Sequence, residues 1–126
     1  MHIQVVEIIN SYKCFCDVQR LRILNLLKGG PLCVCHLVEI LDSDQVKISK
    51  QLRYMKELGM VEGERVAQWM VYRLADATNP LLEENLKCLQ DCYGELIAFN
   101  EDSRKRSSIA DRMLEENAAC AHAING

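Results

Sequence analysis

At Met60 the apolar residues change from a helical period to an alternating one. Upstream of it, apolar residues three and four apart indicate helices over about 3–12, 18–28, 32–41 and 45–58. Downstream, two runs rich in β-branched and aromatic residues, 60–66 and 69–74, predict a β-hairpin with a polar break at Ala67-Gln68. A helix over 80–99, an exposed charged link at 103–108 and a weaker helix at 109–121 are expected to follow.

Helix-terminating residues divide the upstream half. Asp17 precedes the second predicted helix and Gly29 follows it, as expected for an N-cap and a C-terminal stop. Pro31 suits the first turn of a short third helix beginning at Leu32, and Gly59 ends the fourth. The third and fourth helices, separated by residues 42–44, therefore form a tight helix-turn-helix.

This order predicts a mainly α fold with a small β-hairpin, the winged helix-turn-helix. In that fold the second helix of the pair enters the DNA major groove, and the hairpin reaches the flanking backbone. A chain of 126 residues is long enough for one compact domain. We expect residues 1–100 to form the DNA-binding and dimerisation domain and residues 101–126 a charged link and tail. Surplus apolar residues on the first and the 80–99 helices predict a homodimer that associates through terminal helices.

The distribution of charge places the anion-binding surface in the first part of the chain. The net charge is −3. Residues 1–74 nevertheless carry 10 Lys and Arg against 8 acids, whereas residues 75–126 carry 5 against 10. The segment from Gln45 to Arg73 contains six cations and three acids. Its local charge of +3 suits DNA phosphates.

The fourth predicted helix has an apolar face and a polar face. Ile48, Leu52 and Met55 form its core stripe, and the opposite face is polar apart from Val46. Cations there would hold phosphates while Gln and Ser would read base edges. The predicted DNA-binding residues are Gln45, Lys47, Ser49, Lys50 and Arg53 on this helix, with Arg65 and Arg73 on the hairpin.

Seven cysteines point to thiol chemistry. An odd number cannot pair completely within one chain, and no signal peptide or apolar run of membrane-spanning length, roughly 18–20 residues, is evident. We therefore expect a cytoplasmic protein without a membrane partner, in which paired thiols bind soft ions. Cys33 and Cys35 are the favoured metal ligands because two thiols at an exposed helix start are poor core material.

Four segments together resemble the ArsR/SmtB family of metalloregulatory repressors. Residues 12–24 are similar to the family's second-helix entry, and residues 32–37 (Leu-Cys-Val-Cys-His-Leu) to its C-V-C metal box. Residues 47–52 are similar to its recognition helix, and residues 69–74 to its second wing strand. The resemblance covers about Ser11 to Leu74. It implies a homodimeric repressor that leaves operator DNA when Cys33 and Cys35 bind As(III) or Sb(III). A repressor responsive to Cd(II), Pb(II) or Zn(II) is the alternative inducer class.

The geometry of a regular helix suggests how binding would act. Residues i and i+2 point about 200° apart, so Cys33 and Cys35 could share one ion only by distorting the first turn. A helix N-terminus also lowers a thiol pKa and favours the thiolate. Binding would thereby pull on the helix that supports the recognition helix.

The box departs from the arsenical pattern at two positions. Val38 stands where a third Cys is usual, and His36 replaces the usual Asp. Candidates for a third ligand are Cys14, Cys16, Cys88, Cys92 and Cys120. Small-residue packing is the competing interpretation of Cys14 and Cys16, a dimer-interface core that of Cys88 and Cys92, and His36 is a candidate ligand for a harder ion.

Two other functions share parts of this pattern. A redox-sensing repressor of the same fold would oxidise its paired cysteines instead of binding an ion. An enzyme using Cys35 and His36 is disfavoured because neighbouring helix residues diverge and no phosphate loop or carboxylate pair accompanies them. The sequence therefore favours a DNA-binding repressor over an enzyme.

Overall fold

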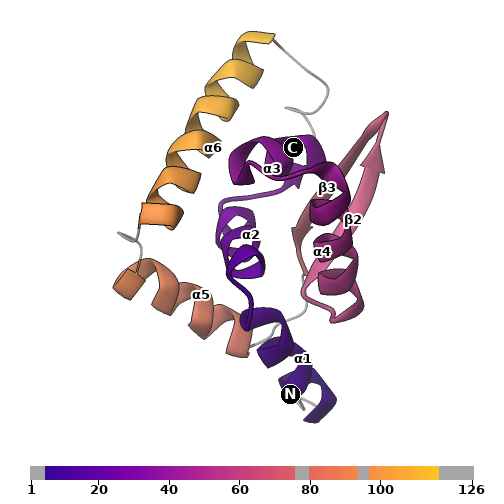
Figure 1. Ribbon diagram of the computed structural model, residues 1–126, viewed down its shortest axis with the longest axis vertical. Helices are drawn as coiled ribbons and strands as arrows, with labels where there is room; N and C mark the ends of the chain where they lie inside the picture. The colour runs from indigo at the N-terminus through magenta and orange to yellow at the C-terminus, as the bar shows by residue number, and fades with distance from the viewer. Residues whose placement is uncertain (1–4, 76–79, 94–96, 117–126) are drawn as a thin grey trace.

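The computed structural model describes residues 5–75, 80–93 and 97–116. The fold is a winged helix-turn-helix, as predicted (Figure 1). Its elements in chain order are α1 (Val5–Phe15), α2 (Val18–Lys28), β1 (Leu32–Cys33), α3 (Val34–Leu41), α4 (Gln45–Glu57), β2 (Val61–Val66), β3 (Trp69–Leu74), α5 (Pro80–Tyr93) and α6 (Ile97–Glu116).

Local caps set the bounds of α2 and α4. Asp17 precedes α2, and its carboxylate accepts the backbone N–H of Arg20 at 3.1 Å. Asp44 precedes α4 and accepts the N–H of Lys47 at 2.8 Å. Gly59, just after α4, has φ +81°, which glycine adopts without steric cost. The predicted bounds of α2 are confirmed, and those of α4 within one residue.

The predicted start of the third helix is wrong. Leu32 and Cys33 form a short strand, β1, whose residues pair antiparallel with Tyr72 and Val71 of β3. The sheet therefore has three strands in the order β1-β3-β2, and α3 begins only at Val34. The outer edge of β3 offers backbone hydrogen-bonding groups, and both side chains of β1 are buried, so the strand outcompetes a first helical turn.

The core lies between the helices and the sheet. Ile48, Leu52 and Met55 of α4 are completely buried, which confirms the predicted stripe. They belong to one cluster with Leu24 of α2 and Val71 of β3. This packing holds α4 with its opposite face turned to solvent.

The region after the wing also differs from prediction. In place of one helix over 80–99 there are two, α5 and α6, and residues 103–108 are helical instead of forming an irregular link. In Figure 1, α6 stands alongside α2 and α3. Residues 117–121 of the expected last helix lie outside the described residues. Division of the chain at residue 100 stays a prediction.

Polar contacts attach α6 to the rest of the domain. The carboxylate of Asp102, fully buried, binds the Arg22 guanidinium through two hydrogen bonds of 2.8 and 2.9 Å. Lys105 donates to the carbonyl of Ile40 at 3.2 Å, and Arg106 to that of Gly29 at 3.1 Å. These hydrogen bonds stabilise the charged run as part of helix α6. No helix among the described residues is long and apolar enough to cross a membrane.

Candidate nucleic-acid interface and metal centre

The outer face of α4 presents the predicted DNA-binding residues. Gln45, Lys47, Lys50 and Arg53 are exposed, Ser49 is partly so, and Val46 is 63% exposed. They lie opposite the buried stripe, as the periodicity predicted. The exposed cations and the Gln45 amide on this face are suitable donors for phosphates and base edges.

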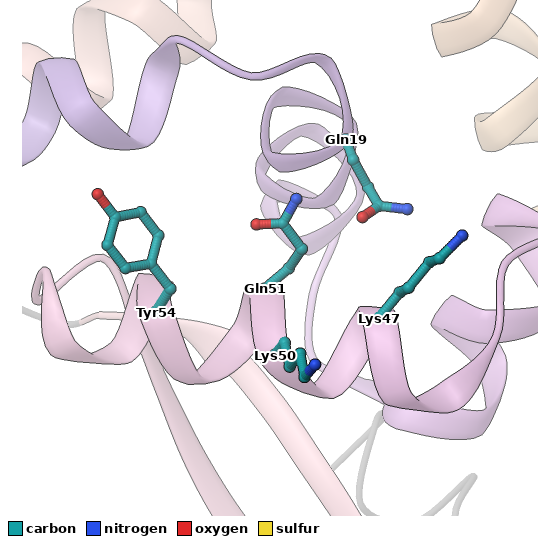
Figure 2. A pocket seen from close by; sticks show the side chains of 5 residues that line it. All are labelled: Gln19, Lys47, Lys50, Gln51 and Tyr54. Atoms are coloured by element: carbon teal, nitrogen blue, oxygen red, sulfur yellow. The ribbon is translucent and has the colours of Figure 1, made fainter.

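A hollow of about 300 Å³ lies where α4 meets the start of α2 (Figure 2). Lys47, Lys50, Gln51 and Tyr54 border it from α4, and Gln19 from α2. The side chains of Gln19 and Lys47 extend toward the same gap. Gln19 is not among the residues predicted from the sequence. Its place in the first turn of α2 was the single sequence signal that it could lie beside a polar surface.

Gln51 is held by residues of α2 and its cap. Its side chain accepts a hydrogen bond from Arg20 at 3.1 Å and donates one to the Asp17 carboxylate at 3.1 Å. The Arg20 guanidinium lies 5.1 Å from the centre of the Tyr54 ring, within cation–π range. These contacts orient α4 relative to α2. They do not involve the predicted DNA-binding residues on the exposed face of α4.

The two predicted wing cations differ in their surroundings. Arg65 on β2 is exposed. Arg73 on β3 is bonded to the carboxylate of Glu64 on the neighbouring strand. Arg65 is therefore the better placed of the two to contact a phosphate, since Arg73 would first have to leave Glu64.

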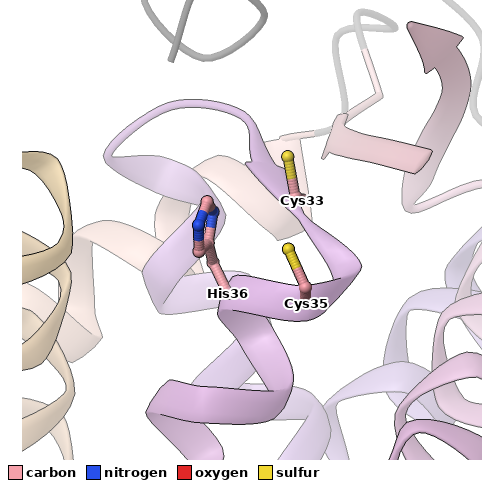
Figure 3. Close-up of side chains that lie close together, drawn as sticks. All are labelled: Cys33, Cys35 and His36. Carbon is pink, nitrogen blue, oxygen red and sulfur yellow. The ribbon is translucent and has the colours of Figure 1, made fainter. Parts of the chain in front are cut away.

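Cys33, Cys35 and His36 form a cluster of possible metal ligands (Figure 3). Their sulfur and ring-nitrogen atoms all lie within 4.8 Å of one another. Cys33 ends β1 and is buried, whereas Cys35 is exposed in the first turn of α3. The Cys33 sulfur is in a disulfide, so it can bind an ion only after reduction.

Two expectations about this cluster are wrong. Cys33 has extended backbone (φ −74°, ψ 151°) instead of helical backbone, so the two sulfurs approach without distortion of a helical turn. Burial raises the pKa of the Cys35 thiol, outweighing hydrogen bonds from the backbone N–H groups of His36 and Cys35 that lower it. The helix N-terminus therefore does not make Cys35 acidic.

None of the described candidates for a third thiol joins this cluster. Cys14 is completely buried in the core, and burial raises its pKa to about 11, which supports a packing role. Cys16 and Cys88 are exposed. The side chain of Cys92 and all of Cys120 lie outside the described residues. Within the described part of the chain, the third donor near the two sulfurs is the imidazole of His36.

A second hollow, of about 280 Å³, connects the cluster to two of the predicted DNA-binding residues. Cys33 and Cys35 border it together with Gln45 at the start of α4 and Arg65 on the wing. Trp69 of β3 borders it as well. The candidate ligands and two predicted DNA contacts therefore share one hollow.

An exposed, basic recognition helix supported by a wing defines the class of winged-helix DNA-binding proteins. A model of the bacterial regulatory protein arsR family matches residues 17–63. The chain is 32% identical over 111 residues to the arsenic resistance transcriptional regulator ArsR1 of Pseudomonas putida, covering 87% of this chain and 84% of that protein. It is 35% identical over 87 residues to the arsenical resistance operon repressor of Bacillus subtilis, covering 68% and 83%. The chain belongs to the arsR family, and is a transcriptional regulator, not an enzyme.

Solved structures show the same fold. HlyU from Vibrio cholerae superimposes with a TM-score of 0.65 at 23% identity, over 75% of this chain and 100% of that chain. The homodimeric winged helix-turn-helix domain of Mb0332 from Mycobacterium bovis, described as a possible ArsR-family regulator, gives 0.59 at 24% identity over 71% and 80%. At these identities the likeness concerns the fold alone.

Proposed function

We propose that this protein is a cytoplasmic, homodimeric repressor that leaves its operator when As(III) or Sb(III) binds Cys33 and Cys35. The observation that carries the proposal is the approach of the two cysteine sulfurs to within 4.8 Å beside the recognition helix. Arsenical regulators and repressors among the relatives support the choice of inducer. Soft thiolates favour such ions over harder ones.

In this proposal the thiols affect DNA binding because they lie next to the residues that would contact DNA. No strain transmitted over a long distance is required. Cys33 joins β1 to α3, and the hollow beside it reaches Gln45 at the first position of α4. An ion at the thiols therefore lies next to residues proposed to contact DNA. An inducer shifts the equilibrium between free and DNA-bound protein only if its affinity for the two states differs.

The dimer is supported by an uncovered apolar face on α1. Val5 is 73% exposed, Ile9 47% and Tyr12 56%, at spacings that place them on one side of the helix. Val6, 61% exposed, adds to this area. A second copy of the chain covering these residues would place two recognition helices at two half-sites, as dimeric winged-helix proteins require.

The decisive experiment compares the reduced wild type with Cys35→Ser in operator binding titrated with arsenite. We expect the variant to bind operator with wild-type affinity, because Cys35 lies off the exposed face of α4, and to show no release by arsenite. Ser49→Ala, which changes a hydroxyl on α4 itself, provides a control that should still be released. Normal release of Cys35→Ser by arsenite would refute the proposed sensor.

The proximity of His36 favours a second candidate, a repressor responsive to Cd(II) or Zn(II). Two thiolates and one imidazole, with a water, form a common four-coordinate set for such ions. The variant His36→Gln separates the candidates. Loss of release by cadmium with retained release by arsenite would assign the imidazole to divalent ions alone.

A further inference from the structure

The hollow between α4 and the start of α2 is lined by polar side chains from both helices (Figure 2). Lys47, Gln51 and Tyr54 are four and three residues apart, so they share one side of α4, and all three extend toward α2. Gln19 extends from α2 into the gap beside Lys47. This side of α4 therefore forms one continuous polar surface with the first turn of α2.

The two hollows described above lie on different sides of α4. Gln45 borders the hollow at the wing together with Arg65, whereas Lys47 borders the hollow at α2. Residues two positions apart point about 200° apart around a helix. A helix with its side chains is about 10–12 Å wide, and the major groove of B-DNA is about 12 Å wide. A recognition helix thus fills the groove, and its two sides face the phosphates of the two strands.

Hydrogen bonds fix the surroundings of Gln19 and leave its own amide available. The side chain of Gln51 is bonded to Arg20 and to the carboxylate of Asp17. That carboxylate also accepts the backbone N–H of Arg20 and lies 4.0 Å from the Arg20 guanidinium, which compensates its charge. Between described residues no hydrogen bond engages the side chain of Gln19. Its amide can donate two N–H groups to a ligand.

The ammonium of Lys47 is also available to an anion. It lies 3.9 Å from the carboxylate of Asp44, but the two side chains are 74% and 57% exposed. An ion pair between exposed side chains contributes only about 0–1 kcal/mol. A phosphate can therefore recruit Lys47 at little cost.

Resting on the operator binding of the proposed function, and not on its inducer, we propose that Gln19 and Lys47 together bind one DNA phosphate in this hollow. Glutamine and lysine are both common phosphate contacts. A water molecule in the liquid occupies about 30 Å³, so a hollow of about 300 Å³ has room for a phosphate group and bridging waters. The contact adds α2 to the DNA interface and holds α4 from the side away from Arg65.

Salt titrations of DNA binding with Gln19 variants test the phosphate contact. Gln19→Lys places a second cation at the phosphate, so the slope of log K against log salt should become steeper by about 0.9. Gln19→Ala removes a neutral donor and should weaken binding about fivefold without changing the slope. Fluorescence anisotropy with the operator and with an unrelated duplex, both at low salt, should show the same fold-change for the two, because every sequence carries the phosphate.

Matched controls separate this contact from general effects of the substitutions. Asn25→Ala truncates an amide of α2 that does not border the hollow. Ser107→Lys adds the same charge on α6, where Ser107 is exposed, and Figure 1 shows α6 and α4 on opposite sides of α2. Both controls should bind DNA as the wild type does. Circular dichroism during thermal unfolding verifies that every variant is folded.

Each other outcome overturns a defined claim. A slope for Gln19→Lys no steeper than for Ser107→Lys, or affinity of Gln19→Ala equal to that of Asn25→Ala, would refute the contact. Weakening confined to the operator would make Gln19 a reader of bases instead. Displacement of DNA by inorganic phosphate beyond that by chloride at matched ionic strength, lost in Gln19→Ala, would assign the hollow to a free anion.

Failure of the proposed function is distinguishable from failure of this inference. If the wild type binds DNA but arsenite does not release it, the proposed inducer is wrong and the phosphate contact is unaffected. If the wild type binds neither duplex, the proposed repressor and the phosphate contact both fail.

Discussion

Replacing Asp102 by Asn should destabilise the protein more than any other single change to the polar contacts of α6. Asp102 is fully buried, while the side chain of its partner Arg22 is 24% exposed. Removing one member of a buried ion pair costs about 3–5 kcal/mol, because the other charge is left uncompensated. Arg22 can regain some hydration, so we expect about 3 kcal/mol. For a chain of this size that corresponds to a fall in Tm of roughly 12 °C.

Glu39→Gln is the matched control for this prediction. Glu39 of α3 forms an ion pair of 3.0 Å with Arg112 of α6, but both side chains are about half exposed. An exposed pair contributes about 0–1 kcal/mol, so Tm should change little. Urea unfolding monitored by circular dichroism and by Trp69 fluorescence measures both variants. If Asp102→Asn costs no more than Glu39→Gln, burial does not determine how α6 is held.

Three further outcomes are expected. Lys50→Ala should weaken operator binding and reduce the slope of log K against log salt by about 1, whereas Lys87→Ala on α5 should change neither; an unchanged slope would remove Lys50 from the phosphate contacts. Ile9→Lys should convert the dimer to a monomer in sedimentation velocity and weaken operator binding, and a dimeric variant would place the interface elsewhere. Burial raises the pKa of Cys14 to about 11, so the stability it contributes is complete below pH 9 and lost as the pH rises toward 11. Urea unfolding should show wild type losing more stability than Cys14→Ala over that range, and parallel curves would contradict the assignment.

The local signals predicted α2, α4 and the hairpin correctly. The caps Asp17 and Asp44 and the turn glycine Gly59 act within a few residues of themselves, and the buried stripe of α4 follows directly from helical period. The sequence also predicted Cys33 and Cys35 as ligands, and the structure brings their sulfur atoms within 4.8 Å of each other. Residues 17–63, which carry most of these signals, are those that the arsR family model matches.

Partners distant in the chain decided the rest. Leu32 and Cys33 are extended because they pair with Tyr72 and Val71 of β3, and that pairing brings the two sulfurs together without helix distortion. The charged run in α6 becomes helical with Asp102 bonded to Arg22, 80 positions earlier in the chain. Propensity and period report only on neighbours in sequence, whereas edge pairing and buried ion pairs depend on what the folded chain brings alongside. The sequence alone thus predicted candidate residues for reading DNA and binding a soft ion, and the tertiary structure decided that Gln45 and Arg65 share a hollow with the thiols.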